Sequence, residues 1–240
     1  MFPFCAANEL ILPPRGPPRL ALDGPSAYVG HMSSRLHSRI FSQGFIESCQ
    51  PSAAPKPPNG PDWLHEIKYD GFRLLAWRDD DRVRLYTRGG FDWVERYPAV
   101  ASAVGSLKVQ SCCIDEVVVC YEAGKPSFEL LRSRQQDRIA FLYAFDLLAL
   151  DGEDLRHEPL ETRKATLASL LRKAPPGIAL SEHLEGDGQL VFGHACRLGL
   201  EGIVSKRRNS PYKSGTSLNW IKSKNPASAA VLRESTEDWS

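Results

Sequence analysis

Proline placement limits where this chain can fold. Of its 18 prolines, 11 fall within residues 1–61, in phrases such as LPPRGPP and APKPPNGP. Proline lacks a backbone N–H and fixes φ, so these phrases sustain neither a helix nor an interior strand. We therefore predict a Pro-rich, disordered leader over 1–44, in which Met32 is a plausible natural start, then a folded domain over 45–225 and a short acidic tail over 226–240.

Beyond the leader, strand-like segments alternate with helical ones. Runs rich in β-branched and aromatic residues predict strands at WLHEIKY, FRLLAWR, RVRLYTR, CCIDEVVVC, IAFLYAFDLLAL, GIVSKR and NWIKSK. Apolar spacing predicts helices over DWVERYPAVASAV, LETRKATLASLLRK and DGQLVFGHACRLG, the last ending at Gly199. Strands in pairs with helices between them favour an α+β fold built on antiparallel sheets.

Composition excludes some partners. Charged residues make up 25% of the chain and the formal net charge is +1, so the overall charge argues for no partner by itself. No run of about 18 apolar residues is present, so we expect no membrane partner. The six cysteines show no CxxC or Cys/His ligand spacing and follow no secretory signal, which predicts reduced thiols and a cytoplasmic location.

Positive charge is concentrated in residues 202–225, a segment that contains lysines and arginines but no acid. Strand side chains alternate between faces, so Lys222 and Lys224 in WIKSK project from the same face. Two ammonium groups on one face can then bind one polyphosphate. The alternative interpretation is that both lysines lie on a strand face that contacts only solvent. The cations of this segment are Lys206, Arg207, Arg208, Lys213, Lys222 and Lys224.

The stretch WLHEIKYDGFR places four charges, those of Glu66, Lys68, Asp70 and Arg73, within eight positions of an otherwise apolar strand. Unpaired charge is costly in a buried strand. A lysine amine with a reference pKa of about 10.4 is almost fully charged at pH 7, so a nucleophilic lysine needs desolvation or a cationic neighbour. The apolar strand, which ends at an Asp-Gly turn, supplies the desolvation, and Arg73 and the lysines of residues 202–225 supply the cationic neighbours. The alternative is a solvated lysine paired with Glu66 or Asp70.

Six motifs occur in order between Phe45 and Asn225, namely KYDGFR, YTRGG, IDEVVV, FLYAFDLLALDG, LEGIVSKR and WIKSKN. Together they resemble the nucleotidyltransferase motifs of ATP-dependent DNA ligases, especially the ligase domain of bacterial end-joining ligases and their short stand-alone relatives. The resemblance implies an ATP-grasp-like α+β domain with two antiparallel sheets and flanking helices. We expect no OB-fold domain, because 16 residues follow Lys224.

The resemblance also implies a role for each matched residue. Lys68 attacks the α-phosphate of ATP, expels pyrophosphate and holds AMP, which then passes to a 5′-phosphate of nicked or broken double-stranded DNA. The other implied roles are Glu66 beside the adenine, Arg73 and Arg88 at the ribose or the DNA 5′-phosphate, Phe145 stacked on the adenine, Lys206, Lys222 and Lys224 on the triphosphate, and Glu116 and Glu201 as ligands of Mg²⁺ or Mn²⁺.

One motif departs from the family pattern. The family's third motif reads Asp-Gly-Glu within a strand, whereas here Asp115 and Glu116 are adjacent. Since strand side chains alternate, loss of one residue turns a side chain to the other face unless a bulge absorbs the change. This departure bears directly on the metal role of Glu116.

Two other function classes stay open at this point. An RNA ligase or mRNA-capping nucleotidyltransferase shares the KxDG lysine chemistry, and a degenerate, non-catalytic nucleotide- or DNA-binding module shares the fold. For the ligase interpretation we expect DNA repair by end joining, a DNA-end-binding protein as a candidate partner, and a bacterial, nucleoid-associated location.

Overall fold

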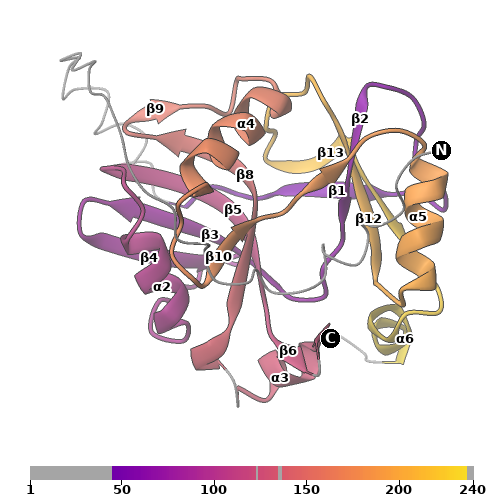
Figure 1. Cartoon of the computed structure of the whole chain (residues 1–240), viewed down its shortest axis with the longest axis horizontal. Coiled ribbons are helices and arrows are strands. Elements are labelled where there is room, and N and C mark those ends of the chain that lie inside the picture. Colours follow the sequence, from indigo (N-terminus) through magenta and orange to yellow (C-terminus); the bar gives the residue numbers. More distant parts are fainter. Residues whose placement is uncertain (1–44, 123, 135–136, 237–240) are drawn as a thin grey trace.

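The computed structural model describes residues 45–122, 124–134 and 137–236. The predicted leader over 1–44 lies outside the described residues, and the division of the chain into domains stays a prediction. Two β-sheets with flanking helices form an α+β fold, as the sequence predicts (Figure 1).

Sheet A has five strands in the order β1-β13-β12-β2-β11. Its pairs are antiparallel except for β1 with β13, which run parallel. The strands are β1 (Cys49–Ala53), β2 (Trp63–Ile67), β11 (His183–Leu184), β12 (Gly202–Arg207) and β13 (Gly215–Lys224).

Sheet B has six strands, in the order β10-β8-β5-β3-β4 with β9 paired to β8. Its one parallel pair, β10 with β8, also lies at an edge, so the predicted antiparallel pairing holds for the rest of the sheet. The strands are β3 (Phe72–Asp79), β4 (Arg82–Thr87), β5 (Ser111–Val119), β8 (Phe141–Leu150), β9 (Glu153–Asp154) and β10 (Ile178–Leu180). A separate ribbon pairs β6 (Tyr121–Glu122) with β7 (Lys125–Pro126).

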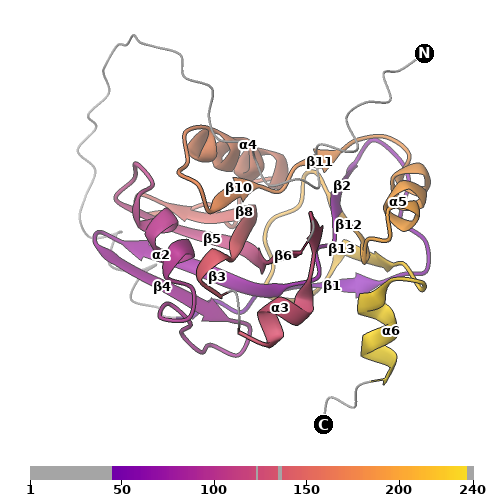
Figure 2. The same cartoon turned by 60° about the horizontal axis from the view of Figure 1, so that its bottom comes forward.

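The helices lie beside the sheets. Both views place α2 and α4 next to sheet B and α5 next to sheet A (Figure 1, Figure 2). The helices are α2 (Pro98–Gly105), α3 (Phe128–Arg132), α4 (Leu160–Leu171), α5 (Gly188–Arg197) and α6 (Ala229–Thr236), with a 3₁₀ turn at Asp137–Ile139.

Sheet B packs on both of its faces. Leu74 of β3 packs with Val100 of α2 and Leu167 of α4 in one core cluster. The next residue, Leu75, points the other way and packs in a second cluster with Trp220 of sheet A. Burial of both faces explains why the central strand β5 is apolar along most of its length and buried at every position.

Most predicted elements are present, with one clear error. The helix predicted over residues 92–104 begins at Pro98, which occupies the first helical turn. Before it, Asp92 forms an isolated bridge with Tyr86 and its carboxylate accepts a hydrogen bond from the Val94 amide. The predicted end of α5 is confirmed, because Gly199 has a φ of 72° just after the helix.

The sequence predicts neither a membrane-spanning helix nor an OB-fold domain, and both can be examined in the described residues. None of its helices is long and apolar enough to cross a membrane. Its strands form the two sheets and the β6–β7 ribbon, and no OB-fold barrel is found among these residues.

A buried ion pair joins α4 to sheet B. Arg163 donates from Nε to Asp146 Oδ1 at 2.7 Å and from Nη2 to Oδ2 at 2.8 Å, and both side chains are 0% exposed. Nη1 of Arg163 donates to the carbonyls of Glu158 and Ser210. Partners of this kind satisfy a guanidinium that would otherwise be too costly to bury.

Replacing Arg163 by methionine should lower the free energy of unfolding by about 3–5 kcal/mol, because Asp146 would keep a buried charge without its partner. Urea unfolding followed by circular dichroism measures the loss. Arg172→Met, at the exposed end of the same helix, is the control and should change stability by less than about 0.5 kcal/mol. Equal stability of the two variants would contradict the role given to the pair.

Candidate active site

Lys68 lies at the end of β2, where the chain leaves sheet A. Its amide donates to the carbonyl of Gly202 at 2.9 Å, and its Nζ donates to Glu201 Oε1. The Lys68 side chain is 24% exposed and that of Glu201 is 3% exposed, so a partly accessible amine sits on a buried carboxylate. Burial raises the pKa of Glu201, although the charge of Lys68 opposes this shift.

A glycine makes this contact possible. Gly202 has a φ of 146°, and a Cβ at this position would lie 2.1 Å from the carbonyl oxygen of Ser223. Any side chain would therefore separate β12 from β13. The glycine keeps Glu201, its neighbour in sequence, close to the lysines of β13.

Two lysines of β13 lie beside Lys68. Lys224 Nζ is 3.9 Å from Glu201 Oε1, the same oxygen that Lys68 contacts. Burial lowers the pKa of Lys222, and the charges of Lys224 and Lys68 lower it further, with a smaller contribution from Arg88. We call Lys68, Glu201, Lys222 and Lys224 the nucleophile cluster. Its excess of positive charge suits a polyphosphate.

Helix α6 contacts the same region. Its Arg233 donates from Nη2 to both carboxylate oxygens of Asp70, at 2.7 and 2.9 Å. The next residue, Glu234, accepts a hydrogen bond from Lys224 Nζ. The predicted acidic tail therefore includes a helix that places a carboxylate on the nucleophile cluster.

A second cluster lies deeper in the molecule, around Glu66 of β2. Lys164 of α4 donates to its Oε1 and Lys206 of β12 donates to its Oε2, each at 2.8 Å. Burial alone would raise the pKa of Glu66, but these two ammonium groups hold it below its usual value. We call Glu66, Lys164 and Lys206 the carboxylate cluster.

The carboxylate cluster adjoins two aromatic rings. Lys206 Nζ lies 4.2 Å from the ring centre of Phe145 and 4.1 Å from that of Trp220. Burial lowers the pKa of Lys206, and the charge of Glu66 opposes this shift. The structure therefore places Lys206 with Glu66 and Phe145, whereas Lys222 and Lys224 lie with Lys68. Of the three lysines predicted to hold the triphosphate, Lys206 therefore binds Glu66, and Lys222 and Lys224 lie at the nucleophile cluster.

Arg73 also lies near Phe145, and its guanidinium donors are bound to groups within the chain. Its guanidinium binds both carboxylate oxygens of Asp115 and the carbonyl of Cys49, and its Cζ lies 5.2 Å from the Phe145 ring centre. Asp115 also accepts a hydrogen bond from the Tyr212 hydroxyl at 2.7 Å. Arg73 thus supports Phe145, while Arg88 is exposed just after β4.

Glu116 is not brought to either cluster. Its neighbours two positions away, Ile114 and Val118, belong to the core cluster between sheet B and its helices, so Glu116 faces that core. Glu116 is 0% exposed, and both carboxylate oxygens lack a hydrogen-bond partner. Burial raises its pKa well above the usual value. Asp115, one residue earlier, is the acid that faces Arg73.

Metal-binding groups are sparse in the structure. Among the described residues, no group of three or more His, Cys, Asp and Glu side chains could hold an ion by itself. Of the two predicted metal ligands, Glu201 alone lies beside Lys68. A single carboxylate fits a magnesium ion that takes its other ligands from substrate phosphates and water.

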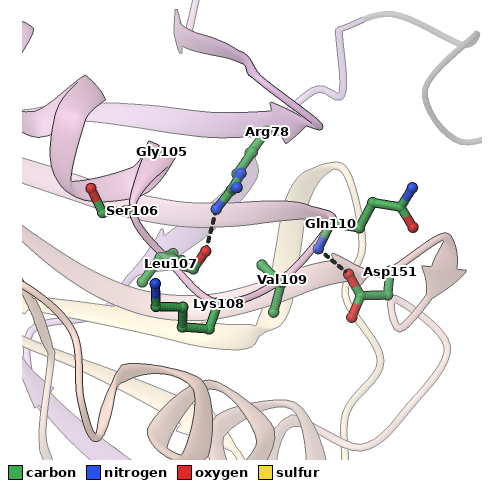
Figure 3. A pocket seen from close by; sticks show the side chains of 8 residues that line it. All are labelled: Arg78, Gly105, Ser106, Leu107, Lys108, Val109, Gln110 and Asp151. Atoms are coloured by element: carbon green, nitrogen blue, oxygen red, sulfur yellow. Dashed lines mark hydrogen bonds between the residues drawn. The ribbon is translucent and has the colours of Figure 1, made fainter. Parts of the chain in front are cut away.

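One further hollow lies at the opposite end of β3 from Arg73 (Figure 3). There Arg78 donates to the carbonyl of Leu107, and Asp151 accepts from the amide of Gln110 at 2.7 Å. These polar groups already bond within the chain, so we assign no function to this hollow.

Comparison with known proteins gives the family of the chain. Residues 48–224 match the family model described as the ATP dependent DNA ligase domain. The chain belongs to the ATP-dependent DNA ligase family. The match spans Lys68, Glu201 and the lysines of β13, so both clusters lie within the ligase domain.

Relatives of this ligase domain include a protein named for end joining. The multifunctional non-homologous end joining protein LigD of Pseudomonas aeruginosa is 41% identical over 179 residues, which cover 72% of this chain and 21% of that protein. The prophage-derived DNA ligase-like protein LigB of Bacillus subtilis is 31% identical, covering 70% of this chain and 63% of that protein. The chain thus spans about a fifth of the length of the LigD relatives it matches.

Solved structures agree with this placement. A mycobacterial DNA ligase D complexed with ATP and MES superposes with a TM-score of 0.67 at 29% identity, covering 75% of this chain and 60% of that one. The ligase domain of Mycobacterium tuberculosis LigD gives a TM-score of 0.65 at 30% identity, with the same coverage. The predicted ligase fold is therefore confirmed.

Sequence reasoning missed several contacts of this ligase domain. The buried positions of α4 are Leu160, Arg163, Lys164, Leu167 and Leu171, a spacing typical of an apolar stripe. Two cations within such a stripe indicate buried acids. The alternation of β5 could likewise have identified Asp115. No comparable signal predicts Trp220 beside Lys206 or Arg233 on Asp70.

Replacing Glu116 by glutamine tests its burial in the core of the ligase domain. The folded pKa of Glu116 lies above its usual value of 4.5, so the wild type loses stability as pH rises from about 4.5 through the folded pKa. Glutamine does not titrate. The variant should therefore gain stability relative to the wild type as pH rises, and match it most closely at low pH.

Urea unfolding at a series of pH values measures this difference. Glu153→Gln removes an exposed carboxyl and is the control, with an expected change below about 0.5 kcal/mol at neutral pH. A pH-independent difference for Glu116→Gln would show that the Glu116 carboxyl has the same pKa in the folded and unfolded chain, which would contradict its burial without a partner.

Proposed function

We propose that this chain is an ATP-dependent DNA ligase that forms a covalent lysyl-AMP intermediate on Lys68. The observation that carries the proposal is the contact between the partly exposed Lys68 amine and the buried carboxylate of Glu201, beside Lys222 and Lys224. The family match over residues 48–224 supports ATP as the nucleotide and DNA as the substrate.

The geometry suits each part of the adenylation step. The amine nitrogen of Lys68 forms a bond to the α-phosphorus, and the bond from that phosphorus to pyrophosphate breaks. The proton lost by the attacking nitrogen passes to Glu201, which already contacts Nζ and whose pKa is raised by burial. Lys222 and Lys224 neutralise the departing phosphates. A bound Mg²⁺ or Mn²⁺, held by Glu201, would add further neutralisation.

The nucleotide base is proposed to lie at the carboxylate cluster. Phe145 offers a ring for stacking, and Glu66 offers a carboxylate that accepts a hydrogen bond from an exocyclic amine. Lys206 belongs to this end of the site, in contact with Glu66. Arg88, exposed and close enough to influence Lys222, is proposed to contact the DNA 5′-phosphate.

The family match also supports a second half of the reaction. We propose that AMP passes from Lys68 to the 5′-phosphate of nicked or broken double-stranded DNA, for strand joining in DNA repair. The end-joining names of the LigD relatives support this role, and support a DNA-end-binding protein as partner in a bacterial, nucleoid-associated setting. The DNA ligase family favours this reading over an RNA ligase or capping enzyme.

Intact-protein mass spectrometry tests the adenylation step. After incubation with ATP and Mg²⁺ or Mn²⁺, the wild type should gain one AMP, and pyrophosphate should remove it. Lys68→Met should gain none, whereas Lys213→Met, which alters an exposed lysine, should label like the wild type. Folded wild-type protein that gains no AMP with either metal would instead support a non-catalytic binding module.

Replacing Glu234 by glutamine should strengthen ATP binding. The carboxylate of Glu234 holds Lys224 and competes with the triphosphate for it. Because Glu234 is 46% exposed, the expected gain is modest, up to about fivefold in Kd and smaller at high salt. Titration calorimetry measures it.

Glu129→Gln breaks another exposed ion pair, that with Arg132, and serves as the control for the Glu234 variant. Its ATP affinity should equal that of the wild type. Weaker ATP binding by Glu234→Gln would mean that Glu234 supports the site instead of competing for it.

A further inference from the structure

Lys164 lies where the chain passes from one sheet to the other. Its Nζ donates to Glu66 Oε1 of sheet A at 2.8 Å and to the carbonyl of Ser181 at 3.1 Å. Ser181 follows β10 of sheet B and precedes β11 of sheet A, and its amide donates to the carbonyl of Ala144 in β8. One ammonium group therefore joins both sheets at their crossover.

The same ammonium group reaches the backbone of Phe145. Lys164 Nζ lies 3.5 Å from the Phe145 carbonyl oxygen, a longer contact than the other two. Phe145 and Glu66 are the two residues proposed to recognise the base. Lys164 is thus in contact with both, although it reaches the site from α4 on the far side of β8.

Burial of the Lys164 side chain restricts where its ammonium group can lie. The Lys164 side chain is 3% exposed, and an ammonium group in such surroundings needs acceptors for its hydrogens. Its three contacts are oxygens from Glu66, Ser181 and Phe145. The position of Nζ is therefore fixed by groups on three different segments.

The carboxylate cluster holds two positive charges, those of Lys164 and Lys206, against the single negative charge of Glu66. Lys164 and Lys206 each bind one oxygen of the same carboxylate. If Lys164 were neutral, Glu66 would keep Lys206 as its partner at 2.8 Å. Removal of Lys164 consequently leaves Glu66 paired with Lys206 but frees its Oε1, so the main role of Lys164 at this carboxylate is to hold that oxygen in place.

We propose that Lys164 is a positioning residue for base recognition, which holds the Glu66 carboxylate and the Phe145 backbone in the arrangement that selects adenine over guanine. The inference rests on the proposed function. Adenine presents an amine donor at the position where guanine presents a carbonyl acceptor, and a fixed carboxylate accepts from the first and repels the second. A carboxylate free to rotate discriminates less.

The selectivity depends on direction as well as charge. Lys206 holds Oε2 of Glu66, and Lys164 holds Oε1, so together they restrict rotation of the carboxylate plane. Each oxygen keeps a lone pair for a further hydrogen bond. Loss of Lys164 leaves Oε1 of Glu66 without its restraint, whereas the Phe145 ring is still available for stacking.

Equilibrium binding of ATP and GTP to Lys164→Met tests the proposal. The measurement is made in the Lys68→Met background with Mg²⁺, so that no covalent adduct forms. The Kd for ATP should rise about tenfold, as expected for loss of a charged hydrogen bond that orients the acceptor, and that for GTP less than about threefold. Lys164→Arg, which keeps a cation, should recover part of the preference for ATP.

Lys173→Met alters an exposed lysine just beyond α4 and should leave both affinities unchanged. Thermal unfolding checks that each variant is folded, and Lys164→Gln replaces the methionine variant if that one is not. An unchanged ratio of ATP to GTP affinity in the folded variant would overturn the proposal, as would a parent protein that binds neither nucleotide. Labelling of wild-type Lys68 is a separate measurement, so failure of adenylation is distinguishable from failure of this inference.

Discussion

The position of the Glu66 carboxylate determines much of the site. This buried acid is held between Lys164 and Lys206, which come from α4 and β12, while Glu66 itself belongs to β2. A carboxylate in the interior is costly unless its oxygens are bound, and the two ammonium groups bind one oxygen each. The carboxylate cluster consequently joins two strands of sheet A, β2 and β12, to helix α4 of sheet B. The three elements meet at one point beside Phe145.

The site then divides into two ends with different chemistry. At the deeper end, Glu66 and Phe145 offer an acceptor and an aromatic ring, which suit a base. At the more accessible end, Lys68 contacts Glu201 beside Lys222 and Lys224, which suit phosphates and a nucleophilic attack. Because Lys68 and Glu66 lie two positions apart near the end of β2, one strand connects both ends.

The sequence predicts the accessible end better than the deeper one. Lys68, Lys222 and Lys224 follow from short motifs and from strand alternation, which is a local property. Lys206 also belongs to a short motif, but its contact with Trp220 depends on the pairing register of β12 with β13, which is a property of the whole sheet. Glu116 faces the core, while the pairing of β5 with β8 shifts register on each side of Ile114–Asp115. The adjacency of Asp115 and Glu116 signals an irregularity at this point, but it does not show which face each side chain takes. The docking of α6 on Asp70 is a contact between distant segments, which the sequence alone does not show.

A crystal structure of the chain with a non-hydrolysable ATP analogue tests the division of the site most directly. We predict the base against Phe145 with its amine on Glu66, the α-phosphorus next to Lys68 Nζ, and the outer phosphates on Lys222 and Lys224. Glu234 should then have left Lys224. A triphosphate bound at Lys206, or a base away from Glu66 and Phe145, would contradict the account.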